Sequence, residues 1–493
     1  MKKPLLFFAF LITFVSFAQD GSLDLSFGDD GVVITDLHEG SNFSSAVIEQ
    51  LDGKVISGGF SFVNSTEENA LIRYNLDGTV DTSFGNNGVL ITPIVGNLDL
   101  KFQQGNKLIV SGSVDHSTGN ISLFRYLSDG TLDNTFATNG VLATDLPNGN
   151  LYKINLFDDD SFLLTGSYNA NNIFFIVFQK YLNNGTLDTS FGNNGRIINQ
   201  IGSPDSFIDE VKIHSNSIYV LAPKQSYNDF VISVLKFTED YILDDNFGTN
   251  GIATTSIDII PGNSQKSIAF DLFDDGSIYL AGGHGNCDDF YMAFHAKLKP
   301  DGEKDTSFGN YGVQVLSSNY YMPEQVIIQE NNRVLIAGNV SECFEWSFAT
   351  ISRYFSDGFE DASFNLQDDG QEVFFDDMQI LADGKIIMVG TTPWYNGNFG
   401  SDFAIVRYNN NTLSISEFEN QKTTIYPNPS NGIFTIEREL FSENTPFQIT
   451  DITGKIIILG ELTEKQTQLN LSSAQSGVYF LKTSNSVFRL MKN

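Results

Sequence analysis

Tyr-Asn-Leu-Asp-Gly-Thr-Val-Asp-Thr-Ser-Phe-Gly-Asn-Asn-Gly-Val, residues 74–89, is a stretch that recurs along the whole chain. Its core, Asp-x-Ser-Phe-Gly-x-x-Gly, places a phenylalanine at positions 27, 84, 136, 191, 247, 308 and 364, so that successive copies lie 52 to 61 residues apart. Seven copies at this spacing are typical of a repeat architecture, in which each unit is one supersecondary structure.

Between two copies of the motif, the sequence predicts four short strands. In the first unit these are Val32–Asp36, Ser45–Glu49, Lys54–Gly58 and Ala70–Tyr74. Asp52-Gly53, between the second and third strands, is a strong hairpin signal because both positions can take positive φ. The fourth strand ends with a cation and usually an aromatic residue, as in Arg73-Tyr74.

Units of this length cannot bury both faces of a sheet alone, so they pack radially as propeller blades or form an open stack. The propeller is favoured because seven units lie within the usual range of blades and because the units vary in length. The predicted fold class is all-β: a seven-bladed β-propeller of four-stranded blades, followed by a small C-terminal β-sandwich.

The formal net charge of −32, from 60 acidic and 28 basic residues, argues against binding to nucleic acid or to anionic lipid. The acidic doublets Asp158-Asp159 and Asp274-Asp275 favour a solvated surface. Calcium stays open as an alternative, although neither doublet has the spacing of a calcium loop. No other cofactor or metal is predicted, since the five histidines share no ligand spacing.

The two cysteines, Cys287 and Cys343, each lie five residues after a glycine that ends an apolar strand, in neighbouring units. A disulfide between adjacent units is therefore possible in an oxidising compartment, as is the free-thiol alternative.

The first 18 residues, with Lys2, Lys3 and the apolar run Pro4–Phe17, predict a cleavable secretory signal. No later stretch is long enough and apolar enough for a membrane span. The predicted domains are a signal peptide (1–18), the propeller (19–408), a polar linker (409–422) and a C-terminal domain (423–493) whose short alternating strands favour a β-sandwich.

Two resemblances follow from these motifs. Leu187-Asp188-Thr189-Ser190-Phe191-Gly192-Asn193-Asn194-Gly195 resembles the signature of the bacterial delta-60 repeat family, which implies a β-propeller of unassigned activity. Ala137, Asn246 and Asn365 depart from that signature. The tail, from Tyr426-Pro427-Asn428-Pro429 through Gly432 to Gly477 and Tyr479, resembles the type A sorting domain of the type IX secretion system. That resemblance implies a partner, the type IX secretion machinery, and release or surface attachment in a Gram-negative bacterium.

The motif supplies the only chemistry present in all seven units. Its carboxylates are predicted to cap turns rather than to catalyse, because a catalytic site needs one pair and not seven equivalent groups. These repeat-turn residues are Asp24, Asp81, Asp133, Asp188, Asp244, Asp305, Asp361, Phe27, Phe84, Phe136, Phe191, Phe247, Phe308 and Phe364. Each Asp is expected to accept the N–H groups of the following Ser and Phe, and the strand-end cations are expected nearby in partly exposed pairs.

Ligand contact is expected at the other end of the units, where loops differ in length and chemistry. Trp346, Trp394 and Tyr395 in these loops could stack on a sugar, although loop packing is the alternative. No catalytic motif is present, so the sequence favours a non-catalytic exported binding protein for an unknown glycan or protein. The alternative is a propeller hydrolase or lyase acting on extracellular polysaccharide.

Overall fold

The computed structural model describes residues 19–493 apart from 38–39, 64–65, 115–120, 145–149, 172, 203–207, 223, 226–229, 257–264, 287–288, 317–320, 342–346, 368–372, 393–400, 411–422, 439–444, 452–454, 476 and 484–486. The predicted signal peptide, Cys287, Cys343, Trp346, Trp394 and Tyr395 therefore lie outside the described residues. The chain divides into two compact units, Met1–Thr412 and Leu413–Asn493.

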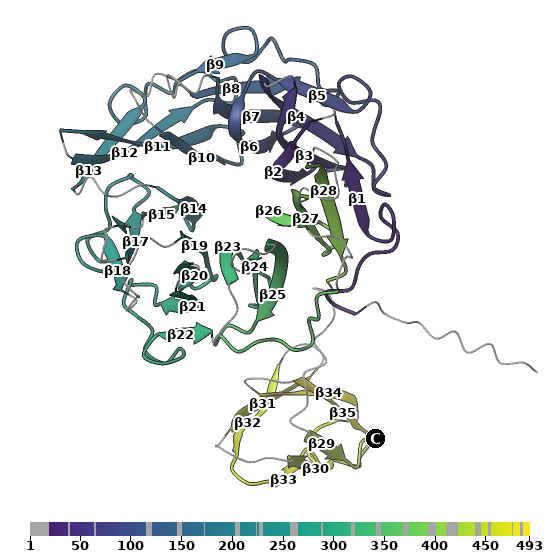
Figure 1. The fold of residues 1–493 in the computed structure, drawn as a ribbon. Helices are drawn as coiled ribbons and strands as arrows, with labels where there is room; N and C mark the ends of the chain where they lie inside the picture. Colours follow the sequence, from purple (N-terminus) through teal and green to yellow (C-terminus); the bar gives the residue numbers. More distant parts are fainter. Residues whose placement is uncertain are drawn as a thin grey trace, which may run out of the picture. The chain divides into compact units, whose positions relative to one another are not determined.

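The regular secondary structure of the described residues is entirely β-strand, and the first unit holds seven antiparallel sheets within that part of the chain. In chain order these are β2 (Asn42–Glu49), β3 (Val55–Val63), β4 (Thr66–Tyr74) and β5 (Val89–Thr92); β6 (Val95–Gln103), β7 (Lys107–Ser113), β8 (Ile121–Tyr126) and β9 (Val141–Ala143); β10 (Asn150–Leu156), β11 (Phe162–Ala170), β12 (Ile173–Tyr181) and β13 (Arg196–Gly202); β14 (Glu210–His214), β15 (Ser217–Leu221), β16 (Lys224–Gln225), β17 (Phe230–Phe237) and β18 (Ile252–Ser256); β19 (Gln265–Leu272), β20 (Ile278–Asn286), β21 (Asp289–Leu298) and β22 (Val313–Leu316); β23 (Tyr321–Ile328), β24 (Val334–Ser341) and β25 (Ser347–Tyr354); β26 (Phe374–Ile380), β27 (Ile386–Thr391), β28 (Phe403–Tyr408) and β1 (Val32–Thr35). Figure 1 shows these sheets arranged around a common centre, with the first strand of each sheet nearest to it.

The first strand of each repeat belongs to the sheet of the preceding repeat, which corrects the predicted grouping. Val89–Thr92 pairs with β4 and not with the strands that follow it. The reason is that the motif folds back on β4: Asp81 donates its N–H to the Arg73 carbonyl at 2.8 Å, and Arg73 donates its N–H to the Gly88 carbonyl at 3.1 Å. The Asp-x-Ser-Phe-Gly turn therefore joins two strands of one sheet, whereas the prediction had it connecting neighbouring blades.

The last sheet is completed by the beginning of the described chain. β1 pairs antiparallel with β28, with Val32 opposite Val406, and Leu23 forms a further bridge to Tyr408 (Figure 1). Asn409 donates its N–H to the Ser22 carbonyl at 2.8 Å, although the sequence placed Asn409 in the linker. Residues 19–35 thus close the ring of sheets.

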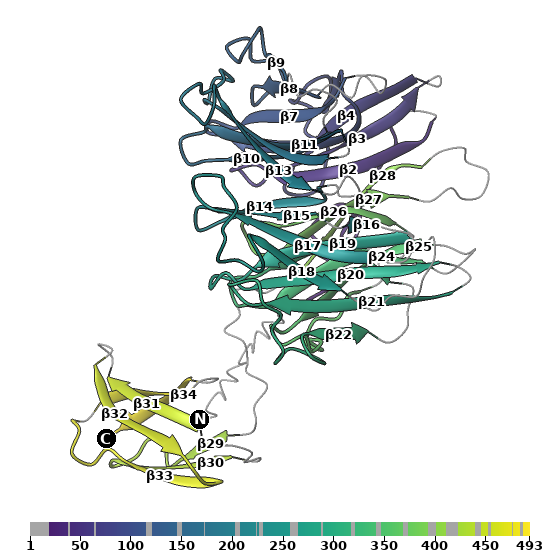
Figure 2. The same cartoon turned by 90° about the vertical axis from the view of Figure 1, so that its left-hand side faces the viewer.

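The turns of the first unit gather at two opposite ends of the strands (Figure 2). Lys54, in the hairpin between β2 and β3, contacts the motif residue Asp81 at 2.7 Å. The hairpins of this type and the motif turns therefore lie at one end, here named the turn face, as predicted. The connections between the second and third strands of each sheet, and those between sheets, lie at the other end, named the loop face.

The hydrophobic core lies between adjacent sheets. In one cluster, Ile56 and Leu71 of the first sheet pack with Leu100, Leu108 and Val110 of the second, and all five are buried. Each such side chain contributes on the order of 2 kcal/mol when removed from water. Because each sheet buries residues on both faces, it is stable only between two neighbours.

The second unit holds two sheets among its described residues, β29–β30–β33 and β32–β31–β34–β35. Their strands are β29 (Thr423–Tyr426), β30 (Ile433–Arg438), β31 (Thr445–Asp451), β32 (Ile456–Leu462), β33 (Gln466–Asn470), β34 (Gly477–Thr483) and β35 (Val487–Lys492). Phe434 and Ile436 of the first sheet share one buried cluster with Ile449, Leu481 and Leu490 of the second. The two sheets therefore have a common core.

Candidate functional site

The motif Asp accepts the N–H of the residue two positions later in every copy. These N–H to carboxylate distances are 3.0 or 3.1 Å, from Ser26, Ser83, Thr135, Ser190, Asn246, Ser307 and Ser363. The prediction for the Phe N–H was wrong. Phe84 donates its N–H to the backbone carbonyl of Asp81 at 3.1 Å, because the Asp81 carboxylate is turned toward Ser83.

The strand-end arginines lie next to these carboxylates, as predicted, but the pairs are buried rather than partly exposed. Arg73 Nε donates to Asp81 at 2.8 Å, and both side chains are buried. The guanidinium also lies 4.7 Å from the centre of the Phe84 ring. The same three-residue arrangement recurs as Arg125–Asp133–Phe136, Arg353–Asp361–Phe364 and Arg407–Asp24–Phe27. The exposure of these Arg–Asp pairs was misjudged because a turn of the next sheet covers each pair.

The same arginines connect each sheet to its successor. Arg125 donates through Nη1 to the Asn183 carbonyl at 2.5 Å, in the turn of the next sheet. Ala137 donates its N–H to Asn184 at 2.7 Å in that turn. At the closure of the ring, Arg407 of the last sheet donates to the Leu76 carbonyl of the first at 2.8 Å. The repeated carboxylates therefore hold neighbouring sheets in register.

Copies four to six have a lysine in place of the arginine. Lys236 pairs with Asp244 at 3.0 Å in a half-buried contact. In the fourth copy Ser190 donates to a half-buried Asp188, and the position after the turn carries Arg196 where copies one, two, three, five and six have Val or Ile. The inter-sheet contact is thus not uniform around the ring.

We expect acid to weaken these inter-sheet contacts. Burial alone would raise the pKa of Asp24, but bonds from Ser26 and Lys385 and the charge of Arg407 outweigh it and lower the pKa to about 2. Burial is outweighed in the same way for Asp81 and Asp133, whose pKa values also fall. Because the folded-state pKa lies below the unfolded one, this stability is complete above about pH 4 and is lost as pH falls toward 2, roughly 2 kcal/mol for Asp24.

The measurement is the urea midpoint at pH 6, 4 and 3. Asp24→Asn should be less stable than the wild type at pH 6 and should lose less between pH 6 and pH 3. An equal loss in both proteins would mean that other groups set the acid limit.

A second set of charged residues lies on the first strands of the sheets and was missed by the sequence analysis. This set, here named the inner ring, comprises Asp99, Lys101, Lys153, Glu210, Lys212, Asp271 and Asp377. Its members alternate with buried residues such as Leu100 and Val211. Their sequence signal is a pair of charges two positions apart within an apolar strand, since alternate residues of a strand face opposite sides.

The inner-ring residues face one another across the centre. Lys212 of the fourth sheet contacts Asp271 of the fifth at 2.9 Å and the Val326 carbonyl of the sixth at 3.4 Å. The charge of Asp99, and those of Glu210 and Asp377, raise the pKa of Lys153. These groups come from the second, fourth and seventh sheets, so the space at the centre is lined by both signs of charge.

The inner-ring carboxylates also accept backbone N–H groups of the next sheet. Asp99 accepts from Ile154 at 3.1 Å, Asp271 from Ile328 at 2.7 Å, and Asp377 from Val47 at 2.9 Å. The first strand is the edge of its sheet, so its outward N–H groups would otherwise lack a partner. Burial raises the pKa of Asp377 in spite of the N–H bonds from Val47 and Met378. The inner ring thus has a clear structural role.

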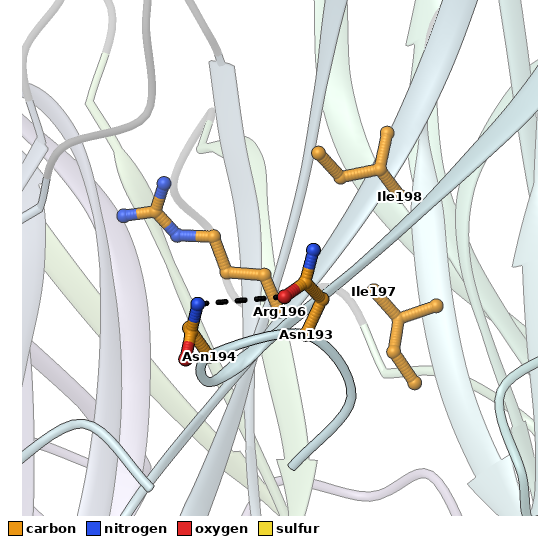
Figure 3. A pocket seen from close by; sticks show the side chains of 5 residues that line it. All are labelled: Asn193, Asn194, Arg196, Ile197 and Ile198. Atoms are coloured by element: carbon orange, nitrogen blue, oxygen red, sulfur yellow. Dashed lines mark hydrogen bonds between the residues drawn. The ribbon is translucent and has the colours of Figure 1, made fainter. Parts of the chain in front are cut away.

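A pocket of about 720 Å³ opens beside the fourth copy of the motif (Figure 3). The described residues that line it are Asn193, Asn194, Arg196, Ile197 and Ile198. Asn194 donates to the side chain of Asn193 at 3.4 Å, so the two amides are held together at its rim. This volume suits a small ligand, but no nucleophile or carboxylate is among the described lining residues.

The predicted ligand-contact residues Trp346, Trp394 and Tyr395 and the predicted disulfide residues Cys287 and Cys343 fall outside the described residues. Within the part of the chain that the structure does describe, no three His, Cys, Asp or Glu side chains are grouped to hold a metal ion. That part also contains no helix long and apolar enough to span a membrane.

The predicted sorting motif folds against the last strand of the second unit. Asn428 accepts the Met491 N–H at 2.8 Å, and Ser430 donates its N–H to the Met491 carbonyl at 2.9 Å. Tyr426 donates its hydroxyl to Glu437 at 2.8 Å. Tyr479 of β34 anchors the opposite side, where its hydroxyl donates to the Gln475 carbonyl at 2.6 Å.

Comparison with protein-family models identifies both parts of the chain. Residues 424–492 match the secretion system C-terminal sorting domain. Residues 50–84, 103–136 and 381–411 match a domain of unknown function described as a β-propeller, DUF5122. The chain is therefore a repeat β-propeller protein that carries a type IX sorting domain, and it is exported to the cell surface or the extracellular space of a Gram-negative bacterium.

The comparison with curated proteins found no match. Among solved structures, the chain is similar to the polysaccharide lyase Uly1 (9% identity, 74% of this chain and 89% of that one, TM-score 0.47). It is also similar to Drosophila Semaphorin 2a (9% identity, 97% and 99% covered, TM-score 0.47). A subtype N10 neuraminidase-like protein of A/little yellow-shouldered bat/Guatemala/060/2010 is a further case (15% identity, 67% and 98% covered, TM-score 0.39). At these scores the likenesses do not bear on activity.

Proposed function

We propose that this protein is an exported, non-catalytic β-propeller that binds an extracellular glycan or protein through its loop face. The observation that carries the proposal is the contrast between the two ends of the first unit. The turn face repeats one set of Asp-centred contacts that hold sheets together. The repeated Asp and Arg side chains of that face therefore have a structural role. The segments that differ from unit to unit join strands at the other end.

The proposal includes a finer description of the fold. The seven sheets form seven blades, and the two sheets around Ile449 form a small β-sandwich. The domains are a signal peptide at 1–18, the propeller at 19–408, a linker at 409–422 and the sorting domain at 423–493. The type IX machinery is the partner of the last domain, which agrees with its family match.

The experiment that tests the binding function is a glycan and matrix-protein array probed with the purified mature protein. Product analysis accompanies every glycan that is bound. Binding without turnover supports the proposal, whereas new reducing ends would identify a hydrolase or lyase. Absence of binding to every member of the array, with the fold intact by circular dichroism, counts against the loop-face proposal.

Replacing Trp394 and Tyr395 by Ala should weaken binding about tenfold while leaving the thermal midpoint unchanged. In the sequence these residues fall between β27 and β28, and an aromatic anchor contributes about 1 to 3 kcal/mol to a contact of this kind. Binding is measured by titration and stability by differential scanning calorimetry.

Phe84→Ala is the matched comparison, because Phe84 is buried between two sheets. It should lower the thermal midpoint. Unchanged affinity in the Trp394 and Tyr395 variant, with binding lost on editing the turn face, would move the site to the opposite end.

A further inference from the structure

Three exposed aromatic residues lie on two adjoining segments of the turn face, at the junction of the fifth and sixth sheets. They are Tyr311 at 79% exposure, Phe359 at 67% and Phe355 at 40%. Large aromatic side chains that are exposed as a group often mark an interaction site, whereas single exposed side chains do not. This group, here named the aromatic platform, is at the opposite end from the loop-face site proposed above and does not depend on it.

Tyr311 occupies a backbone conformation that an aromatic residue rarely adopts. Its φ is 52°, in the left-handed region. The equivalent residues of five other copies are Asp30, Asn87, Asn139, Asn194 and Asn250, with φ between 51° and 53°. Asn and Asp tolerate this conformation well, whereas a bulky side chain is disfavoured there. The sixth copy therefore keeps a tyrosine at a position whose backbone favours asparagine, and retained strain of this kind points to function.

Phe355 and Phe359 lie side by side on one turn. Phe355 donates its N–H to the Phe359 carbonyl at 2.8 Å. In the first repeat the equivalent side chains, Asn75 and Thr79, are hydrogen-bonded at 3.0 Å, which shows that the two positions share one face of the turn. In the other repeats these positions carry Leu127 and Thr131, Leu182 and Thr186, Thr238 and Ile242, and Lys299 and Glu303. Only this turn of the six carries two aromatic rings.

The turn of the two phenylalanines packs against the loop that carries Tyr311. A Cβ added at Gly358 would meet the Phe308 ring at 2.6 Å and the Gln314 side chain at 2.6 Å, so the two segments are in close contact. Arg333 holds one side of the platform, with its guanidinium 5.2 Å from the centre of the Phe355 ring and 2.9 Å from Asp361. The position of the Phe355 ring is therefore set before any partner arrives.

The charges around the platform favour an uncharged partner. Arg333 is paired with Asp361, Lys299 is paired with Glu303 at 3.1 Å, and Lys297 donates to the Ser356 carbonyl at 3.4 Å, so none of these three cations can neutralise an anion without losing a contact. The chain as a whole carries a formal net charge of −32, which repels acidic polymers. The nearby amides of Asn310 and Gln314 supply neutral hydrogen-bonding groups.

From these observations we infer that the aromatic platform binds a neutral polysaccharide, with pyranose rings stacked on Tyr311, Phe355 and Phe359. The apolar C–H face of a pyranose matches the face of an aromatic ring, and its equatorial hydroxyls match amide donors and acceptors. The protein is exported to the cell surface or the extracellular space. A protein partner would be expected to need a broader apolar surface than three rings provide.

The test is isothermal titration of the mature protein, residues 19–493, with cellohexaose, xylohexaose, mannohexaose and laminarihexaose. At least one of these should bind to the wild type. Tyr311→Asn should weaken that binding about fivefold, the loss expected for one aromatic contact. The same substitution should not lower the thermal midpoint, because it installs the residue that the other copies use at this φ. Phe355→Thr with Phe359→Thr should weaken binding more than tenfold.

Two controls separate this site from others. Leu182→Asn changes an exposed residue at the turn position equivalent to Phe355 and should leave binding unchanged. The Trp394 and Tyr395 variant tests the loop face alone, so failure of one site is distinguishable from failure of the other. The inference is overturned if no hexasaccharide binds, or if binding survives intact in both platform variants. Loss of a co-purifying outer-membrane protein in those variants, with no saccharide bound, would also overturn it and would mark the platform as a protein interface.

Discussion

A chain that begins at Asp36 should fail to form a stable first unit. Deleting residues 19–35 removes the outer strand β1, the buried Phe27 and the carboxylate of Asp24. Loss of one buried Phe costs about 3 to 5 kcal/mol, and an arginine left buried without its partner costs a similar amount. The sum is comparable with the 5 to 15 kcal/mol by which folded domains are typically stable. We expect loss of the cooperative thermal transition in circular dichroism, and rapid hydrogen exchange in β26, β27 and β28.

A permuted chain provides the control. Asn409 donates to the Ser22 carbonyl at 2.8 Å and accepts the Gly21 N–H at 2.8 Å, the same pattern that Asn75 makes with Thr79 and Gly78. Residues 19–35 placed directly after Asn409 therefore rebuild an ordinary repeat turn. This variant should recover the thermal transition that the deletion loses. A deletion that melts like the wild type would show that the closing strand contributes little.

The turn hydrogen bond of the motif could be predicted because it depends on local spacing. Asp and Ser two residues apart determine one N–H to carboxylate bond, and that bond is present in every copy. The pairing of Val89 with Ile72 could not be predicted in the same way, because the choice between two neighbouring sheets depends on contacts made around Arg73 and Gly88. A repeat defined in sequence need not coincide with a sheet.

The burial of Arg73 was missed for a related reason. Nothing near it in sequence indicates that Ser128, 55 residues later, accepts its Nη1 proton. The inner ring was overlooked because Asp99 and Lys101 look like surface residues of an amphipathic strand, and only the packing of neighbouring sheets brings Asp99 close to Lys153. Tyr311 gave a visible signal, an aromatic residue in place of asparagine, whose meaning depends on the φ that the structure provides.

Asp361→Asn should be among the most damaging single substitutions in the chain. Asp361 is 2% exposed and accepts from Arg353, itself 1% exposed, at 2.8 Å. Removing the negative charge leaves the buried Arg353 with one carboxylate partner, Asp20 at 2.7 Å. It also removes the carboxylate that pairs with Arg333. Breaking a buried pair in this way costs about 3 to 5 kcal/mol, because the other charge stays out of water. The amide keeps an oxygen that can still accept the Ser363 N–H, so the turn itself is preserved.

Asp188→Asn is the matched control, since the same atom is changed at the same motif position in a copy where the side chain is half-buried and the strand-end cation is Lys180. Ser190 still finds an acceptor there, and surface charges contribute about 0 to 1 kcal/mol. The urea midpoint at pH 7 should therefore fall markedly for Asp361→Asn and barely for Asp188→Asn. Arg353→Leu combined with Asp361→Asn should cost less than the two single changes together, because removing both members leaves fewer unpaired buried charges than removing either one. Equal losses at Asp361 and Asp188 would mean that the turn hydrogen bond, and not the buried ion pair, carries the stability of the repeat.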